Sequence, residues 1–177
     1  DRENLLNAGR SYNFYTYDNE VDNYQQDHYQ LMFAHKFSKT LNLNVAGHYT
    51  RGRGYYEQYR TDDDFSTYGF APVIFSSDTV TSTDLIRRRW LDNHFYGGVF
   101  ALNYEKNKFE LTWGGSLNQY VGGHFGEVIW SEFASTSSIR DRYYDNDAMK
   151  TDIGSYVKGM YKLNKFRFYA DLQFRHV

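Results

Sequence analysis

The stretch that decides the fold is residues 153–175, IGSYVKGMYKLNKFRFYADLQFR. Apolar and polar residues alternate on both sides of Asn164–Lys165, which is typical of strands with one apolar and one polar face. A turn at Asn164–Lys165 fixes the register, and it predicts these opposite pairs: Leu163 with Phe166, Val157 with Leu172, and Lys158 with Asp171. The last pair joins opposite charges across the strands. The segment therefore predicts an antiparallel hairpin.

The same alternation surrounds two other short turns, near residues 39 and 106. Each register keeps apolar residues opposite apolar residues, and it predicts these pairs: Phe33 with Val45, Tyr29 with Tyr49, Tyr104 with Phe109, and Phe100 with Trp113. Along the whole chain we expect strands near residues 10–17, 24–37, 40–59, 88–105, 108–123, 149–163 and 165–176. Long irregular loops are expected over 60–88 and 124–149.

The composition excludes several classes of protein. The 177 residues include 18 Tyr, 14 Phe and 3 Trp, yet the mean hydropathy is −0.75. No apolar run reaches the roughly 18 residues of a transmembrane helix. The absence of cysteine excludes a disulfide framework and a thiol nucleophile. A net charge of −2 argues against a nucleic-acid-binding protein.

Short turns alternating with long loops are the layout of an outer-membrane β-barrel. Across the core segments of the predicted strands, one face carries no Asp, Glu, Lys or Arg, whereas the other carries many, as a water-filled or plugged lumen would allow. The predicted lipid-facing residues are Leu31, Phe33, Leu43, Val45, Phe100, Leu102, Leu111, Trp113, Val157, Phe168 and Leu172. Lys158 and Asp171 are predicted as a lumen pair. A soluble β-sandwich gives the same alternation, but the many aromatics and the Tyr/Arg/Gly-rich extension 50–60 favour the barrel.

We therefore expect an all-β fold, an antiparallel up-and-down transmembrane β-barrel. About seven strands are expected, whereas bacterial single-chain barrels have even numbers. Open strand edges are untenable in lipid, and the C-terminal residues 174–177 end in the middle of a pattern. The chain is thus expected to be one part of a larger barrel domain.

Four stretches resemble the barrel domain of TonB-dependent outer-membrane receptors: DNEVDNYQQDHYQL (18–31), HYTRGRGYYEQYR (48–60), DLIRRRWLDNHFYGGVFALNY (84–104) and HFGEVIW (124–130). The resemblance implies a 22-stranded barrel in the cell outer membrane, occluded by an N-terminal plug. It also implies active import of a scarce ligand: a siderophore, haem, cobalamin, a glycan or a peptide. The implied partners are the protein's own plug domain, the TonB energy-coupling complex, which acts through an N-terminal box, outer-membrane lipid and a surface lipoprotein. Plug and box are expected to lie outside this chain.

No catalytic motif or cofactor fingerprint is present, so we expect neither an enzyme nor a bound cofactor or metal. Candidate ligand-binding residues lie at the loop ends of strands: Tyr55, Tyr56, Tyr59, Arg87, Arg88, Trp90, His94, His124 and Trp130. The three tyrosines and Trp90 are better explained as a membrane-interface girdle or as packing within the loops, with stacking on a ligand as the alternative. Arginines 87–89 fit an anionic ligand, lipid headgroups, or salt bridges to the acidic clusters 62–64 and 145–147. Two further readings of the chain stay open: a passive barrel, such as a porin or adhesin, and a soluble β-sheet binding module.

Overall fold

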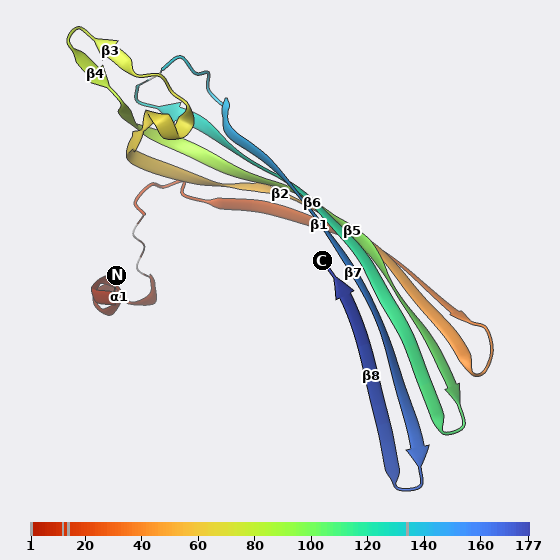
Figure 1. Cartoon of the computed structure of the whole chain (residues 1–177). Coiled ribbons are helices and arrows are strands. Elements are labelled where there is room, and N and C mark those ends of the chain that lie inside the picture. The colour runs from red at the N-terminus through yellow and green to blue at the C-terminus, as the bar shows by residue number, and fades with distance from the viewer. Residues whose placement is uncertain (1, 12, 14, 134) are drawn as a thin grey trace. The chain divides into compact units, whose positions relative to one another are not determined.

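The computed structural model describes residues 2–11, 13, 15–133 and 135–177. The fold is all-β apart from a short helix α1 (Arg2–Ala8) and 3-10 turns η1 (Gly9–Ser11) and η2 (Phe65–Tyr68). Six strands form one antiparallel sheet in the order β1-β2-β5-β6-β7-β8 (Figure 1). Their bounds are β1 Asp22–Lys36, β2 Leu41–Asp64, β5 Ser82–Lys106, β6 Phe109–Ser131, β7 Arg142–Leu163 and β8 Phe166–His176. A separate hairpin pairs β3 (Val73–Phe75) with β4 (Asp78–Val80).

The chain divides into two compact units. Unit 1 contains residues 1–24, 54–90 and 125–145, and unit 2 contains residues 25–53, 91–124 and 146–177. β1 and β8 are the edge strands of the described sheet, which is not closed into a barrel. No helix in the described part of the chain is long and apolar enough to cross a membrane.

Unit 2 contains the three tight hairpin turns, which lie together at one end of its strands (Figure 1). The register predicted for the last hairpin is confirmed, with Leu163 opposite Phe166 and Lys158 opposite Asp171. Ring contacts agree with the other two registers: Tyr29 stacks on Tyr49, Phe100 packs edge-on against Trp113, and Tyr104 contacts Phe109. The turns at Asn107 and Asn164 use φ angles of 56° and 52°, a left-handed conformation that Asn tolerates well.

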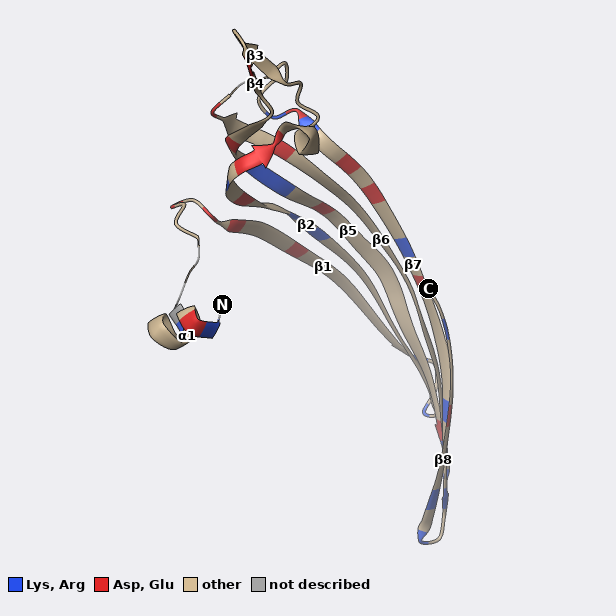
Figure 2. Cartoon of the chain, turned by 60° about the vertical axis from the view of Figure 1, so that its left-hand side comes forward, with Lys and Arg blue, Asp and Glu red and all other residues tan. Residues whose placement is uncertain are grey.

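The two faces of unit 2 differ in charge. Residues 28–35, 40–50, 93–104 and 111–124 contain no Asp, Glu, Lys or Arg, and in Figure 2 these runs are tan. Among the predicted lipid-facing side chains, Leu31 and Leu172 are 79% and 78% exposed, and none is buried. From Lys150 onwards, the charges of β7 and β8 fall on the opposite face, where Arg175 pairs with Asp152 at 2.6 Å and Lys162 with Glu110 at 2.5 Å.

Among the described residues, the buried apolar cluster lies in unit 1. Tyr68, Leu85 and Val128 form its centre, and Phe70 and Tyr143 pack against it. The turn η2 places Tyr68 there. Asp64 caps the start of the turn, where its carboxylate accepts from the Ser66 amide, and the turn ends at Gly69.

Some predicted boundaries were wrong. In the segment 10–17, residues 10 and 11 belong to η1 and residues 13 and 15–17 form no strand, while 12 and 14 lie outside the described residues. The segment 17–21 is held to β2 by hydrogen bonds from the Tyr17 and Asn19 side chains to the Glu57 carboxylate and by the Glu57 amide, which donates to the Val21 carbonyl at 2.9 Å. The two long loops are also shorter than expected. β2 continues to Asp64 and β5 already begins at Ser82, which shortens the first loop. β6 continues to Ser131 and β7 already begins at Arg142, which shortens the second. These extensions mix buried side chains, such as Leu85 and Val128, with polar and charged ones, so they lack the regular apolar alternation that identifies a strand.

Candidate functional site

The centre of the candidate site is a carboxylate buried in unit 1. Glu57, on β2, is 1% exposed. It accepts hydrogen bonds from the Tyr17 hydroxyl at 2.7 Å, Asn19 Nδ2 at 2.6 Å and Arg88 Nε at 2.7 Å. Burial alone would raise the pKa of Glu57, but these donors outweigh it and hold the pKa below its ordinary value. The carboxylate is therefore charged and ties the segment 17–19 to β2 and β5.

A row of stacked aromatic and cationic groups continues from this carboxylate. The Arg88 guanidinium lies 4.2 Å from the centre of the Tyr55 ring, and Tyr55 contacts Trp90 at 4.6 Å between ring centres. Trp90 stacks on Phe125 at 5.7 Å, and the Arg142 guanidinium lies 3.6 Å from the Phe125 ring centre. The row crosses β2, β5, β6 and β7, and cation–π attraction stabilises both of its ends.

Arg87 lies one residue before Arg88, so its side chain reaches the other face of β5. Its guanidinium donates to Gln58 Oε1 at 2.9 and 3.2 Å and to the Tyr68 hydroxyl at 3.0 Å. Tyr68 in turn donates to Asp63 at 2.5 Å. Burial and the hydrogen bond to Asp63 raise the pKa of the Tyr68 phenol, which stays protonated. This chain of hydrogen bonds joins η2 to the sheet.

A hollow of about 380 Å³ in unit 1 is lined by Thr16, Tyr17, Tyr59, Ile86 and Trp130. The Tyr17 and Tyr59 rings lie 5.9 Å apart between centres. The hydroxyl of Tyr59 donates to Asp84, on β5. That hydrogen bond, followed by one from the Asp62 amide, lowers the pKa of Asp84. The hollow thus presents ring faces, while the two phenol hydroxyls are engaged by carboxylates.

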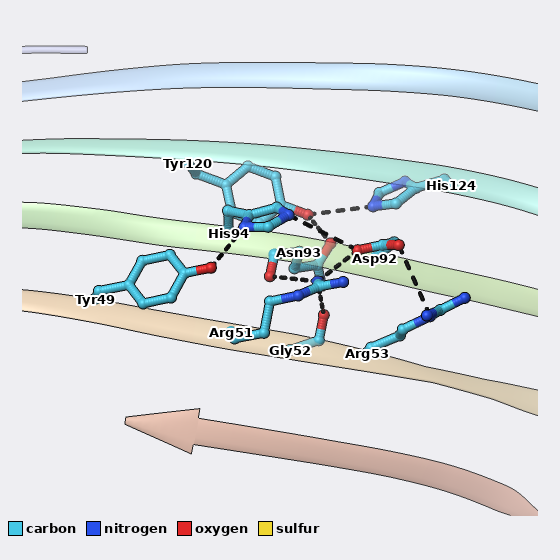
Figure 3. A network of polar contacts seen from close by, with 9 residues as sticks. All are labelled: Tyr49, Arg51, Gly52, Arg53, Asp92, Asn93, His94, Tyr120 and His124. Carbon is cyan, nitrogen blue, oxygen red and sulfur yellow. Dashed lines mark hydrogen bonds and ion pairs between the residues drawn. The ribbon is translucent and has the colours of Figure 1, made fainter. Parts of the chain in front are cut away.

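A second polar network lies in unit 2 and centres on Asp92 (Figure 3). Asp92 forms an ion pair with Arg51 and lies 3.8 Å from Arg53 Nε and 3.9 Å from His94 Nε2. The Tyr49 hydroxyl contacts His94 Nδ1 at 2.9 Å. One carboxylate therefore organises two guanidinium groups and an imidazole across β2 and β5.

The neighbouring part of this network involves the predicted residue His124. The Tyr120 hydroxyl donates to Asn93 Oδ1 at 2.7 Å and lies 3.2 Å from His124 Nε2. The other paired histidines have separate partners: His28 contacts Thr50 at 3.0 Å, and His48 contacts Asn118 at 2.9 Å. Within the described residues, no group of His, Cys, Asp and Glu side chains has the geometry of a metal site.

Unit 2 also carries a larger hollow of about 790 Å³, lined mainly by residues of its predicted polar face. The polar groups of its lining include Asn44, Ser116, Gln173 and the ion-paired Asp152 and Arg175. Small side chains at Ala34, Ala46, Ala101 and Gly154 leave the space open. The hollow is thus a wide surface of mixed polarity.

The predicted ligand-binding residues do not form one site. Tyr55, Arg88 and Trp90 come together in the stacked row, whereas Tyr59 and Trp130 line the smaller hollow. Tyr56 lies near Arg89 in unit 1, Arg87 contacts Tyr68, and His94 and His124 belong to the Asp92 network of unit 2. Each acid of the run 62–64 accepts hydrogen bonds from the protein itself. Asp62 accepts from the Ser82 hydroxyl, Asp63 from Arg60 and Tyr68, and Asp64 from the Ser66 amide.

Sequence reasoning missed Glu57, Phe125, Arg142 and Asp92. A signal for Glu57 was present, because it is a lone acid within the aromatic run 55–59 and shares strand parity with Tyr55 and Tyr59. Phe125 and Arg142 gave no such signal. Phe125 contacts Trp90, and Arg142 contacts Phe125, only because their strands lie side by side in the sheet.

No protein-family model, curated protein or solved structure matches the chain. The resemblance to TonB-dependent receptors therefore rests on the four sequence stretches and stays a prediction.

Proposed function

We propose that the chain is part of the wall of a TonB-dependent outer-membrane β-barrel that imports a ligand. The observation that carries this proposal is the two-faced sheet of unit 2. Exposed apolar side chains cover one face, whereas the charges of β7 and β8 from Lys150 onwards fall on the other.

The apolar face suits contact with lipid. A tilted membrane strand needs about 9–11 residues to cross the hydrocarbon layer, and the uncharged runs 40–50, 93–104 and 111–124 meet that length. A soluble sheet buries its apolar face beneath a second layer, whereas Leu31, Phe33 and Leu172 are all more than half exposed. Lipid would cover this face in the proposed setting.

The opposite face suits a polar lumen. Lys158 lies opposite Asp171, and Arg175 and Lys162 have carboxylate partners. The hollow of about 790 Å³ gives this face room for water or for a plug domain. Pairing with further strands at β1 and β8 would satisfy the backbone groups of the sheet edges, as a membrane requires.

Site-directed labelling tests the face assignment, because the chain contains no cysteine. In outer membranes holding the full-length protein without other cysteines, Leu43→Cys should react with a lipid-soluble maleimide. Asn44→Cys should instead react with a small water-soluble maleimide. Equal labelling of both positions by the water-soluble reagent, or recovery of the protein in the aqueous fraction without detergent, would overturn the membrane proposal.

Energy dependence separates active import from the passive barrel. Uptake through a TonB-dependent barrel should stop when the inner-membrane coupling complex is deleted, while the amount of protein in the outer membrane stays unchanged. Uptake that continues in the deletion strain would identify a passive channel.

A further inference from the structure

The three consecutive arginines of β5 have different electrostatic surroundings. Arg88 is ion-paired with the buried Glu57. Arg87 donates to Gln58 and Tyr68, and its charge lowers the pKa of the nearby Asp63. Arg89, in contrast, has no carboxylate partner among the described residues of the chain. It is therefore the one member of the trio whose charge the described structure leaves uncompensated.

Two tyrosines from other strands hold the Arg89 guanidinium. Its Cζ lies 5.5 Å from the ring centre of Tyr56, on β2, and 5.7 Å from that of Tyr144, on β7. Nε of Arg89 donates to the Tyr144 hydroxyl at 3.3 Å. The side chain is nevertheless exposed. Contact with aromatic rings on both sides restricts the guanidinium, and no described residue accepts from its two terminal nitrogens.

The surroundings of Arg89 contain a second unsatisfied polar group. The hydroxyl of Tyr143 is enclosed and has no hydrogen-bond partner within the described residues. Burial raises the pKa of Tyr143, so the hydroxyl stays protonated and remains a donor. Both Tyr143 and Tyr144 approach β6 at Gly126, where a Cβ atom would overlap both rings. Glycine at this position thus allows two phenols to gather beside the arginine.

We propose that Arg89, flanked by Tyr56 and Tyr144, recognises an oxyanion, a carboxylate or phosphate group, on a ligand. A planar guanidinium with two free terminal nitrogens matches such a group in a two-point contact. The Tyr144 hydroxyl accepts from Arg89 Nε and keeps its own hydrogen, so it adds a neutral donor beside the guanidinium. This inference rests on the proposed function only in treating the anion as part of an imported molecule, since the recognition chemistry itself needs no membrane.

Anion titration of the full-length protein in detergent tests the proposal. Citrate serves as the carboxylate probe and pyrophosphate as the phosphate probe, with glycerol as the uncharged comparison and tyrosine fluorescence as the readout. The wild type should bind at least one anion and not glycerol. Arg89→Gln should weaken that binding by about tenfold or more, because a charge-assisted contact is lost. Which anion binds distinguishes the two ligand classes.

Arg60→Gln is the matched control, since Arg60 already has Asp63 as its carboxylate partner at 3.2 Å. It should leave anion affinity unchanged, and Arg89→Lys should restore part of the binding that Arg89→Gln loses. Absence of anion binding by the wild type, or equal affinity in wild type and Arg89→Gln, would overturn the site. Heat-dependent migration of each variant in detergent gels reports the barrel separately. A folded barrel without anion binding thus overturns only this inference, whereas anion binding by a water-soluble protein overturns only the proposed function.

Discussion

Nε of Arg88 donates to the Glu57 carboxylate at 2.7 Å, and the same guanidinium stacks on Tyr55 at 4.2 Å from the ring centre. The arginine thus connects the buried carboxylate to the aromatic row of unit 1. Because Tyr17 and Asn19 share that carboxylate, one side chain links β2, β5 and the segment that precedes β1.

Replacement of Glu57 by Gln should destabilise unit 1 by about 3 kcal/mol, because it leaves Arg88 without a counter-charge in a buried setting. The midpoint of urea unfolding, followed by tryptophan fluorescence, measures this change. Asp145→Asn is the control. Its ion pair with Arg142 is exposed, with side-chain accessibilities of 52% and 47%, and its loss should cost less than about 1 kcal/mol. Equal effects of the two variants would contradict the central role of Glu57.

The stability of unit 1 should fall in acid. Hydrogen bonds hold the pKa of Glu57 below its ordinary value of 4.5 in the folded state, so the unfolded chain binds the proton more tightly. The stabilisation is therefore complete above that ordinary value and is lost as pH falls below it, through the lowered folded-state pKa. Urea midpoints measured between pH 7 and pH 3 should show this decline. Glu57→Gln should decline less over the same range, and parallel curves would argue against the assignment.

Two adjacent glycines of unit 2 should respond differently to the same substitution. A Cβ atom at Gly97 would overlap the backbone of Leu117 and Asn118, whereas at Gly98 the nearest atom, Ala46 O, is 3.5 Å away. Gly97→Ala should therefore destabilise the protein by about 1–3 kcal/mol, the usual range for overpacking. Gly98→Ala should be close to neutral. The midpoints of urea unfolding of the two variants measure this difference. Similar midpoints would show that β5 and β6 can move apart at Gly97 without loss of stability.

Lysine substitution tests the two faces of unit 2 during assembly. Lysine in place of Leu43 or Leu172 should reduce the amount of folded protein in the outer membrane, because a charge in the lipid face costs about 2–4 kcal/mol near the midplane. Lysine in place of Asn44 or Gln173, which line the larger hollow, should be tolerated. Heat-dependent gel migration of membrane fractions measures assembly. Similar yields from both sets would mean that the apolar face does not contact lipid.

Much of unit 2 was predictable from the sequence. Alternation and turn length are local properties, and the register of a tight hairpin follows from its turn. The pairing of Lys158 with Asp171 was predicted in this way and is confirmed. The boundaries at residues 60–88 and 124–149 were not predictable, because the strand extensions there are rich in polar and charged residues and lack the regular apolar period that identifies a strand.

The sequence by itself determined the all-β class, the hairpin registers and the division of each strand into an apolar and a polar face. These depend on neighbours within a few residues along the chain. Only the tertiary structure decided that Arg88 has Glu57 as its partner, that Arg89 lies between Tyr56 and Tyr144, and that η2 packs on Leu85. Such contacts join residues from several strands, and their geometry depends on how those strands pack across the sheet, which no local pattern encodes.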